Sequence, residues 1–545
     1  MAGRLEMRRG ENREVKLISI IIIALFTAFL GYPLVLLLGK SFTRGGSLSL
    51  DNYIQMLTSP SFMVALKNSI LISSLSAILT TGLAFVLAYS INYTNLSTRY
   101  KKFIKVGITL PMLLPTITYG FAIIYSFGKQ GLITKLIGRQ LFEIYGMNGL
   151  LIGYIIYTIP ISFMLIHNTM LYIDKKYLVV SRVMGDSKVS TFMVTIIRPL
   201  IGTLAVSFIQ TFFLCFTDFG IPASVGGKVE VIASVLYNQM LGSVPNFNNG
   251  AVVAVMMLLP SLISIGVLKY LERYNVRYDK ISQIELPENK LRDGICAGSS
   301  AVILLTVLSI FAVIFVVPFT KVWPYRLEFT LEHVQSVLED KSLVKVYTNS
   351  LFVATVTALL GTIVAYGGAL VTARSNISRK VIDLIEGLAS VTNTIPGMVL
   401  GIAFLLAFSG TSLQNTFFLI IMCNVIHFFA TPYMMLENSL SKMNLGWEKT
   451  AKLMGDSWLQ TLIRVITPNT FLSLLEVFGY YFVNAMVTVS AVIFLAGART
   501  MVMTSKIKEL QHFSKYNEIF VLSLLILGTN LCVKLLLEFV TRQKK

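Results

Sequence analysis

The chain has 545 residues, of which 55% are apolar and only 13% are charged, and its formal net charge at pH 7 is +19. A soluble domain cannot keep this much apolar surface from water, so the composition excludes a soluble globular protein and predicts an all-α polytopic membrane protein. Lys and Arg accumulate in the inner loops of such proteins, and no long basic run accompanies the excess here, so we expect no nucleic-acid partner.

The N-terminal segment places Arg8, Arg9, Arg13 and Lys16 before an apolar run at 17–39. The same arrangement is typical of a signal peptide, but this run is long enough to span a bilayer and lacks a clear small-residue cleavage site. We therefore expect a first transmembrane helix that is retained.

Twelve apolar segments approach or exceed the length needed to cross a bilayer core. The first half contains the segments 17–39, 64–91, 104–127, 147–172, 194–220 and 249–271. The second half contains the segments 296–319, 346–373, 382–409, 412–436, 465–496 and 516–540. The stretch 272–295 between them is polar and charged, so the sequence predicts two tandem six-helix units, 1–271 and 296–545, joined by a cytoplasmic linker.

The distribution of basic residues predicts the orientation. If the N-terminus is inside, the inner connections carry most of the Lys and Arg residues. Because basic residues favour the cytoplasmic side, both termini and the segments 173–193 and 441–464 are expected in the cytoplasm. The protein is therefore expected to be a multi-pass protein of a prokaryotic cell (inner or plasma) membrane, in contact with membrane lipid.

The two halves share short sequence matches. Three of them recur at one constant offset, namely Asn68-Ser69 with Asn349-Ser350, Pro115 with Pro396, and Gly120 with Gly401. Because each half has an even number of spans, the two copies point the same way through the membrane. Such a parallel repeat places a transport pathway at the interface between the halves.

The tetrapeptide Met-Gly-Asp-Ser occurs twice, at 184–187 and at 454–457. Both copies lie in inner segments in which apolar and charged residues alternate at spacings that fit a short amphipathic helix. The glycine would end that helix, and a second helix would enter the membrane. One such segment could simply lie on the lipid headgroups, but two copies at equivalent positions favour a duplicated working part.

These segments resemble the inner loop of ABC importer permeases, in which Glu-Ala-Ala, three residues and Gly precede an apolar stretch that ends in Pro. The second copy reads Lys-Thr-Ala-Lys-Leu-Met-Gly at 449–455, and the first reads Val-Val-Ser-Arg-Val-Met-Gly at 179–185. Both copies lack the leading Glu, since Glu448 lies one position early. The resemblance implies that the loops dock onto ATPase subunits through Ser181, Arg182, Met184, Gly185, Asp186, Ser187, Pro199, Ala451, Lys452, Met454, Gly455, Asp456, Ser457 and Pro468.

A second resemblance concerns the outer ends of the fifth and eleventh segments. Asp-Phe-Gly-Ile-Pro at 218–222 is similar to the Asp-Phe-Gly-x-Pro signature of fused two-unit permeases for ferric iron and similar small charged solutes. The stretch 484–495 is similar to the Met-Thr-x-Ser-Ala-Val-x-Phe-Leu stretch of the same group. The resemblance implies ferric iron as the first substrate candidate, with 2-aminoethylphosphonate, thiamine and polyamines as alternatives.

The same stretches have properties of a pathway lining. Asp218 is costly to expose to lipid, and Gly220 and Pro222 would break the helix, so all three are expected to face protein or water. A polar stripe on the matching span is formed by Asn484, Thr488 and Ser490. The alternative is that these polar side chains bond to their own helix or hold helices together.

No cofactor or metal site is expected. The four histidines are scattered without metal-ligand spacing, and Gly-Lys-Ser at 39–41 lacks the first glycine of a phosphate-binding loop. Any ATP would therefore be used by partner chains, and this chain is expected not to be an enzyme.

The sequence is thus identified as resembling the permease subunit of an ABC importer. The expected partners are two copies of a cytoplasmic ATPase subunit and an extracytoplasmic solute-binding protein. The rival is a secondary carrier driven by an ion gradient, which often needs buried carboxylates, and few are evident beyond Asp218 and Glu476. A passive channel is a weaker alternative.

Overall fold

The computed structural model describes residues 2–271, 288–375 and 377–543. Within these ranges, nine helices are long and apolar enough to cross a membrane, and three further candidate spans are pairs of helices bent by more than 40°. The remaining regular secondary structure in these ranges consists of shorter helices and two short β-hairpins. The prediction of an all-α protein with about twelve spans is confirmed.

The first half begins with one long span and ends with another. The first span consists of α1 (Ala2–Phe26), the π-turn η1 (Thr27–Gly31) and α2 (Tyr32–Ser41). The elements that follow are β1 (Thr43–Arg44), β2 (Ser47–Leu48), α3 (Asp51–Thr58), α4 (Pro60–Asn92), α5 (Thr98–Thr109), η2 (Leu110–Leu113), α6 (Thr116–Phe127), α7 (Leu132–Ile137), α8 (Met147–Leu171), α9 (Lys176–Val183), α10 (Lys188–Phe192), η3 (Met193–Ile197), α11 (Arg198–Thr217), α12 (Gly220–Val225), α13 (Ile232–Leu241) and α14 (Phe247–Leu271).

The second half repeats this order. Its elements are α15 (Lys290–Val316), η5 (Val317–Phe319), β3 (Thr320–Val322), β4 (Arg326–Phe329), α16 (Glu332–Glu339), α17 (Lys341–Arg374), α18 (Arg379–Thr394), α19 (Gly397–Phe408), α20 (Phe417–His427), α21 (Ala430–Ser441), α22 (Gly446–Leu453), α23 (Trp458–Thr461), η6 (Leu462–Ile466), α24 (Thr467–Val487), η7 (Val492–Phe494), α25 (Met503–His512) and α26 (Tyr516–Gln543). Of the predicted linker, 272–287 lies outside the described residues, and α15 begins before the predicted boundary at 296.

Two spans that the sequence predicts as continuous are broken at proline. The segments around Pro115 and Pro396 bend by 111° and 106°. Leu114 and Ile395, the residues before them, have extended backbone conformations. A proline disfavours the helical conformation of the residue before it, so η2 and α18 end there and α6 and α19 start in new directions.

The two halves pack internally in the same way. In the first half α4 packs on α8 and α11, and in the second half α17 packs on α21 and α24. The Asn-Ser repeat has one structural role in both. The hydroxyl of Ser69 accepts the backbone N–H of Ile232 at 2.7 Å, and that of Ser350 accepts the N–H of Met503 at 2.8 Å. Each serine therefore ties a long span to the start of the short helix α13 or α25.

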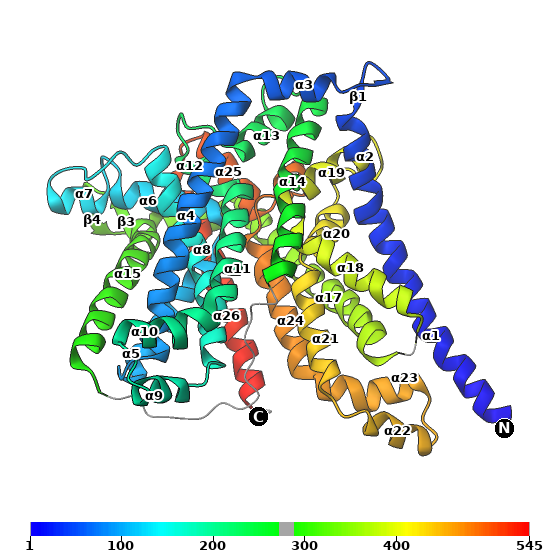
Figure 1. Cartoon of the computed structure of the whole chain (residues 1–545). Coiled ribbons are helices and arrows are strands. Elements are labelled where there is room, and N and C mark those ends of the chain that lie inside the picture. The colour runs from blue at the N-terminus through cyan, green and yellow to red at the C-terminus, as the bar shows by residue number, and fades with distance from the viewer. Residues whose placement is uncertain (1, 272–287, 376, 544–545) are drawn as a thin grey trace.

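The first span of each half crosses to the other half. The rings of Phe26 in α1 and Phe429 beside α21 lie 4.7 Å apart, and α2 packs on α19. In return, α15 packs on α4, α5 and α6, and the hydroxyl of Tyr100 donates to the carbonyl of Ala297 at 2.9 Å. Figure 1 shows α2 beside α18–α20 on one flank and α15 on the other. The halves are thus interlocked around a pseudo-two-fold arrangement.

The duplicated loops lie at the same end of the molecule. In Figure 1, the helices α9, α10, α22 and α23 are at the lower end, and both labelled chain ends lie there too. The helix α3 and the hairpin of β1 and β2 lie at the opposite end.

Candidate functional site

The first loop is a helix that stops at Gly185. After α9 the glycine has φ +83°, a left-handed conformation that side-chain-bearing residues rarely adopt. The N–H of Gly185 donates to the carbonyl of Arg182, and the N–H of Asp186 donates to the carbonyl of Ser181, both at 3.1 Å. This pattern is a Schellman motif, which satisfies the last carbonyls of the helix and turns the chain away.

The second loop repeats this geometry. After α22, Gly455 has φ +92°, and the N–H of Asp456 donates to the carbonyl of Ala451 at 3.1 Å. Lys452 lies within α22, and its side chain is outside the described part of the structure. The glycines therefore hold equivalent turns in the two halves.

The serine of each tetrapeptide begins the next helix. Ser187 accepts the N–H of Ser190 and caps α10, while Ser457 accepts the N–H of Gln460 and caps α23, both at 3.2 Å. The backbone N–H of Ser457 in turn donates to the side chain of Gln460 at 2.8 Å, which completes a capping box. Each Gly-Asp-Ser thus ends one helix and starts another.

The aspartates brace the turns in different ways. The carboxylate of Asp186 accepts a hydrogen bond from the hydroxyl of Ser181, which is itself 3.0 Å from the hydroxyl of Thr191. Asp456 instead accepts a hydrogen bond from Arg464 at 3.2 Å. The loops have the same backbone fold but different side-chain supports.

Each turn presents two large apolar side chains to its surroundings. Val183 and Met184 are 82% and 78% exposed, and Leu453 and Met454 are 88% and 81% exposed. Arg182 beside the first pair is exposed as well. Exposed apolar side chains therefore lie at equivalent positions of the two repeats.

Both loops re-enter the spans through a π-turn and a proline. Pro199 and Pro468 each come two residues after a π-turn, η3 and η6 respectively. The extra residue before the proline in the first copy is accommodated in α10, which has five residues where α23 has four. Pro199 is buried and Pro468 is exposed.

An ion pair that the sequence pattern did not reveal anchors the second loop. The guanidinium of Arg374, at the end of α17, lies 3.7 Å from the carboxylate of Glu448 in α22 and donates to the carbonyl of Met443 at 2.8 Å. The Arg374 side chain is only 3% exposed. The first loop has a different anchor, because the ammonium of Lys175 lies 5.6 Å from the ring centroid of Tyr93.

The residues predicted to line a pathway in the first half lie where α11 ends. Asp218 is buried, and its carboxylate accepts the N–H of Ile221 at 2.9 Å, so it caps the short helix α12. A Cβ atom on Gly220 would lie 2.2 Å from the hydroxyl of Thr116, so the absence of a side chain lets α12 approach α6. Pro222 is buried within α12.

Their counterparts in the second half lie where α24 ends. Thr488 is buried, and Ser490 is partly exposed with its hydroxyl against Gly397 of α19. Asn484 donates to the carbonyl of Tyr480 at 2.8 Å, within its own helix. The structure thus places the predicted residues in two equivalent breaks, one against α6 and one against α19.

Aromatic residues connect the two breaks across the interface. The ring of Phe219, next to Asp218, stacks on that of Tyr237 in α13, with centroids 4.6 Å apart. The rings of Tyr237 in α13 and Phe494 in η7 have centroids 6.3 Å apart. In the described part of the chain, no group of three or more His, Cys, Asp or Glu side chains could hold a metal ion.

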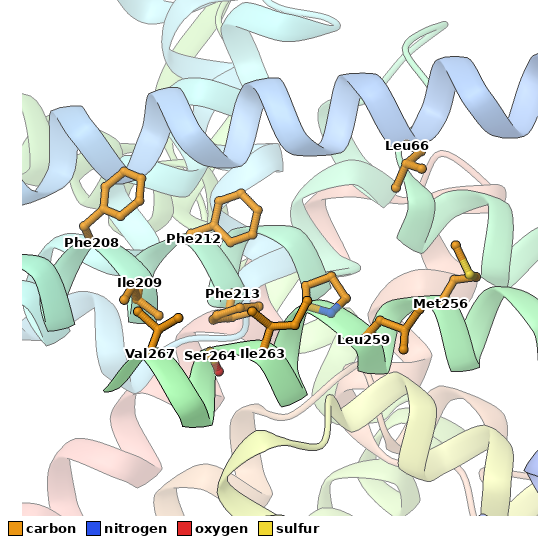
Figure 2. A pocket seen from close by; sticks show the side chains of 11 residues that line it. Leu66, Phe208, Ile209, Phe212, Phe213, Met256, Leu259, Ile263, Ser264 and Val267 are labelled. Atoms are coloured by element: carbon orange, nitrogen blue, oxygen red, sulfur yellow. The ribbon is translucent and has the colours of Figure 1, made fainter. Parts of the chain in front are cut away.

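A separate groove of about 420 Å³ lies between α4, α11 and α14. Its lining is apolar except for Ser264, as Figure 2 shows with Phe208, Phe212 and Phe213 from α11 facing Ile263 and its neighbours on α14. An apolar lining offers no partner to a charged solute, so this groove is not a candidate pathway.

Known proteins share this organisation. The family described as "binding-protein-dependent transport system inner membrane component" matches residues 80–275 and 359–545, once in each half. The ferric transport system permease protein FbpB of Actinobacillus pleuropneumoniae is 26% identical over 93% of this chain and 75% of its own length. A Haemophilus influenzae protein whose name assigns it to ferric transport is 27% identical over 92% of this chain and 80% of its own length.

A shorter relative matches part of the chain. The molybdate/tungstate transport system permease protein WtpB of Pyrococcus furiosus is 26% identical over 34% of this chain and 73% of its own length. The family match covers most of both halves, including both duplicated loops. The chain therefore belongs to the family of binding-protein-dependent transport system inner membrane components.

Proposed function

We propose that this chain is the permease of an ATP-driven importer in which two ATPase subunits bind the loops around Gly185 and Gly455. The observation that carries the proposal is the pair of exposed apolar turns, Val183 with Met184 and Leu453 with Met454, held in the same backbone geometry at one end of the molecule. The excess of basic residues in the connections at that end supports a cytoplasmic position for both loops and both termini.

The loops are built to transmit movement. Each has two short helices whose ends are fixed by hydrogen bonds, so it moves as a rigid unit. Through Arg374 and Glu448, the second loop is joined to α17, which packs on α24. Closure of the ATPase subunits would therefore shift long spans in both halves and alternate access to the interface between them.

The proposed pathway runs between the halves. The breaks at 218–222 and 488–490 would form part of its wall, with Asn484 one turn before the second break. An extracytoplasmic binding protein would deliver the solute to the end that carries α3. This chain would bind no cofactor, and ATP would be hydrolysed by the partner subunits.

Ferric iron is the proposed solute. Support comes from the two relatives named for ferric transport, each of which aligns with more than nine tenths of this chain. 2-Aminoethylphosphonate, thiamine and polyamines are alternatives that the same architecture could carry, since selectivity in such systems resides largely in the binding protein.

Copurification tests the docking surface. We expect the ATPase subunit to copurify with the unmodified chain and to be lost from the double variant Leu453→Ser/Met454→Ser. The matched control is Leu136→Ser in α7, a side chain that is 77% exposed and lies outside both loops. Equal recovery of the ATPase with the loop variant and the control would contradict docking at this turn.

A further inference from the structure

The short helix α25 of the second half is bonded directly to the first half. The side-chain amide of Gln511 donates to the backbone carbonyl of Ala223 in α12 at 2.8 Å. Ala223 follows the Asp-Phe-Gly-Ile-Pro stretch at 218–222, so this hydrogen bond joins α25 to the break at the end of α11. Figure 1 shows α12 and α25 in the upper part of the molecule, toward α3 and away from the duplicated loops.

The equivalent helix of the first half crosses the interface in the other direction. The helices α13 and α25 are counterparts that begin at Ile232 and Met503, the residues bound by the two equivalent serines. The ring of Tyr237 in α13 lies 6.3 Å from that of Phe494 in η7 of the second half, measured between centroids. Lys508 follows Met503 by the same number of residues as Tyr237 follows Ile232. An aromatic ring in one half is thus replaced by an ammonium group in the other.

The ammonium group of Lys508 has no counter-ion among the residues that the structure describes. Glu509, the acidic residue of α25, is paired with Lys506 at 2.7 Å. Lys508 donates to the side-chain oxygen of Gln511 at 2.9 Å, and burial lowers the pKa of its ammonium group without any nearby carboxylate to offset this effect. An ammonium group has three N–H donors, so a single hydrogen bond to a neutral amide leaves this half-buried charge incompletely satisfied.

A second donor without a partner lies one turn away on the same helix. The hydroxyl oxygen of Ser505 is buried and has no hydrogen-bond partner in the described part of the chain. Residues three apart are neighbours on a helix surface, so Ser505 and Lys508 lie on one side of α25. The opposite side is buried through Met503, Ile507 and Leu510. Beside α12, α25 therefore carries two polar groups that lack an acceptor from the protein.

We propose that Lys508 and Ser505 bind an anionic oxygen group of the transported solute, such as a carboxylate, phosphate or phosphonate, at the outer part of the interface between the halves. Hydrogen bonds from an ammonium group to such oxygens are charge-assisted and stronger than those between neutral groups. A metal solute would pass this point as a complex with anionic ligands and not as a bare cation. The proposal deepens the proposed function and rests on it, because it takes this interface as the route of the solute.

The first test measures anion binding at Lys508 without transport. The purified permease is treated with trinitrobenzenesulfonate, which modifies lysine amines, and the rate at each lysine is measured by peptide mass spectrometry. Inorganic phosphate is the probe anion. We expect phosphate to protect Lys508 from modification. In Ser505→Ala, the phosphate concentration for half-protection should rise about tenfold, as expected for the loss of one hydrogen bond to a charged group.

The matched control is Lys345, an exposed lysine near the start of α17, measured in the same digest. Chloride at equal ionic strength replaces phosphate in the reference sample. Lys345 is expected to react at the same rate in both solutions. Absence of protection at Lys508, or equal protection of both lysines, would overturn the proposal, because phosphate would then not bind at α25.

The second test separates this inference from the proposed function. ATP-driven ferric uptake is measured in vesicles that contain the permease with its ATPase and binding protein. We expect Lys508→Gln to reduce uptake at least about tenfold and Lys508→Arg to retain most of it, with ATP hydrolysis stimulated by the binding protein unchanged in both.

Two results would overturn the role of Lys508 in solute binding. One is normal uptake by Lys508→Gln. The other is loss of the stimulated ATP hydrolysis in Lys508→Gln, because the ammonium group would then serve to bind a carboxylate of the binding protein and not the solute. The absence of ATP-driven uptake by the unmodified complex contradicts the proposed function instead.

Discussion

The guanidinium of Arg374 lies 3.7 Å from the carboxylate of Glu448 and joins the end of α17 to the helix before Gly455. The sequence resemblance left Glu448 one position away from the family pattern. In the structure this glutamate has an intramolecular partner, which gives the second loop a connection to the spans that the first loop makes by other means.

Removal of one partner of this pair is expected to destabilise the protein. Arg374→Ala should remove the ion pair between this residue and Glu448 and the hydrogen bond to the carbonyl of Met443. Breaking a buried pair costs on the order of 3–5 kcal/mol, and a surface pair is worth below about 1 kcal/mol. The thermal midpoint of the purified protein should therefore fall much further in Arg374→Ala than in Arg464→Ala, whose pair with Asp456 is more exposed. Equal shifts would show that the Arg374 pair is not structural.

Substitutions of different kinds at Gly185 and Gly455 can test whether the two turns are needed for transport. No atom lies within 4 Å of a Cβ atom built on Gly185 or Gly455, so a side chain would be limited by the left-handed backbone and not by space. Asn tolerates that conformation, and other side-chain-bearing residues pay roughly 1–2 kcal/mol for it. We expect Gly455→Asn to retain uptake and Gly455→Glu to lose it, with both variants inserted in the membrane at normal levels. The same pair of substitutions at Gly185 should behave alike, and unchanged uptake in both Glu variants would contradict the coupling role.

Substitutions at Asp218 can separate the effect of its helix-capping hydrogen bond from the effect of its negative charge. Its carboxylate accepts the N–H of Ile221 at 2.9 Å. Asn can still accept at this position and Ala cannot, so Asp218→Ala should lower stability by about 1 kcal/mol relative to Asp218→Asn. Thermal unfolding of the two purified variants measures this difference. If both variants unfold at the same temperature, the cap does not stabilise α12.

The Asn-Ser repeat predicts matched effects in the two halves. The hydroxyls of Ser69 and Ser350 are acceptors for buried N–H groups, and replacement by Ala leaves each donor unsatisfied at a cost of about 1–3 kcal/mol. Ser69→Ala and Ser350→Ala should therefore lower the thermal midpoint by similar amounts. Ser309→Ala is the control, because this exposed hydroxyl bonds only to its own helix. If only one of the two variants had a lower thermal midpoint, the two serine hydrogen bonds would not contribute equally to stability.

Much of this architecture is predictable from sequence because it depends on local properties. The apolar run lengths predict the spans, and the matches of Ser69 with Ser350 and of Pro115 with Pro396 reveal the repeat. Proline at 115 and 396 identifies where helices are interrupted. The size of the bends depends on how α6 and α19 pack, which hydropathy does not record.

Contacts between the halves are not predictable in this way. Hydropathy identifies 17–39 as a span without specifying its neighbour, so the packing of Phe26 on Phe429 in the other half is visible only in three dimensions. The pairing of Arg374 with Glu448 likewise depends on which helix faces pack together.

In the proposed function, transport by this chain is driven by ATP hydrolysis on partner subunits. The most direct measurement is ferric uptake into proteoliposomes that contain the permease, the binding protein and either an active ATPase or one disabled in ATP hydrolysis. We expect uptake with ATP and the active ATPase, and none with the disabled one. Uptake by the chain alone, driven by an ion gradient without ATP, would contradict it and identify a secondary carrier.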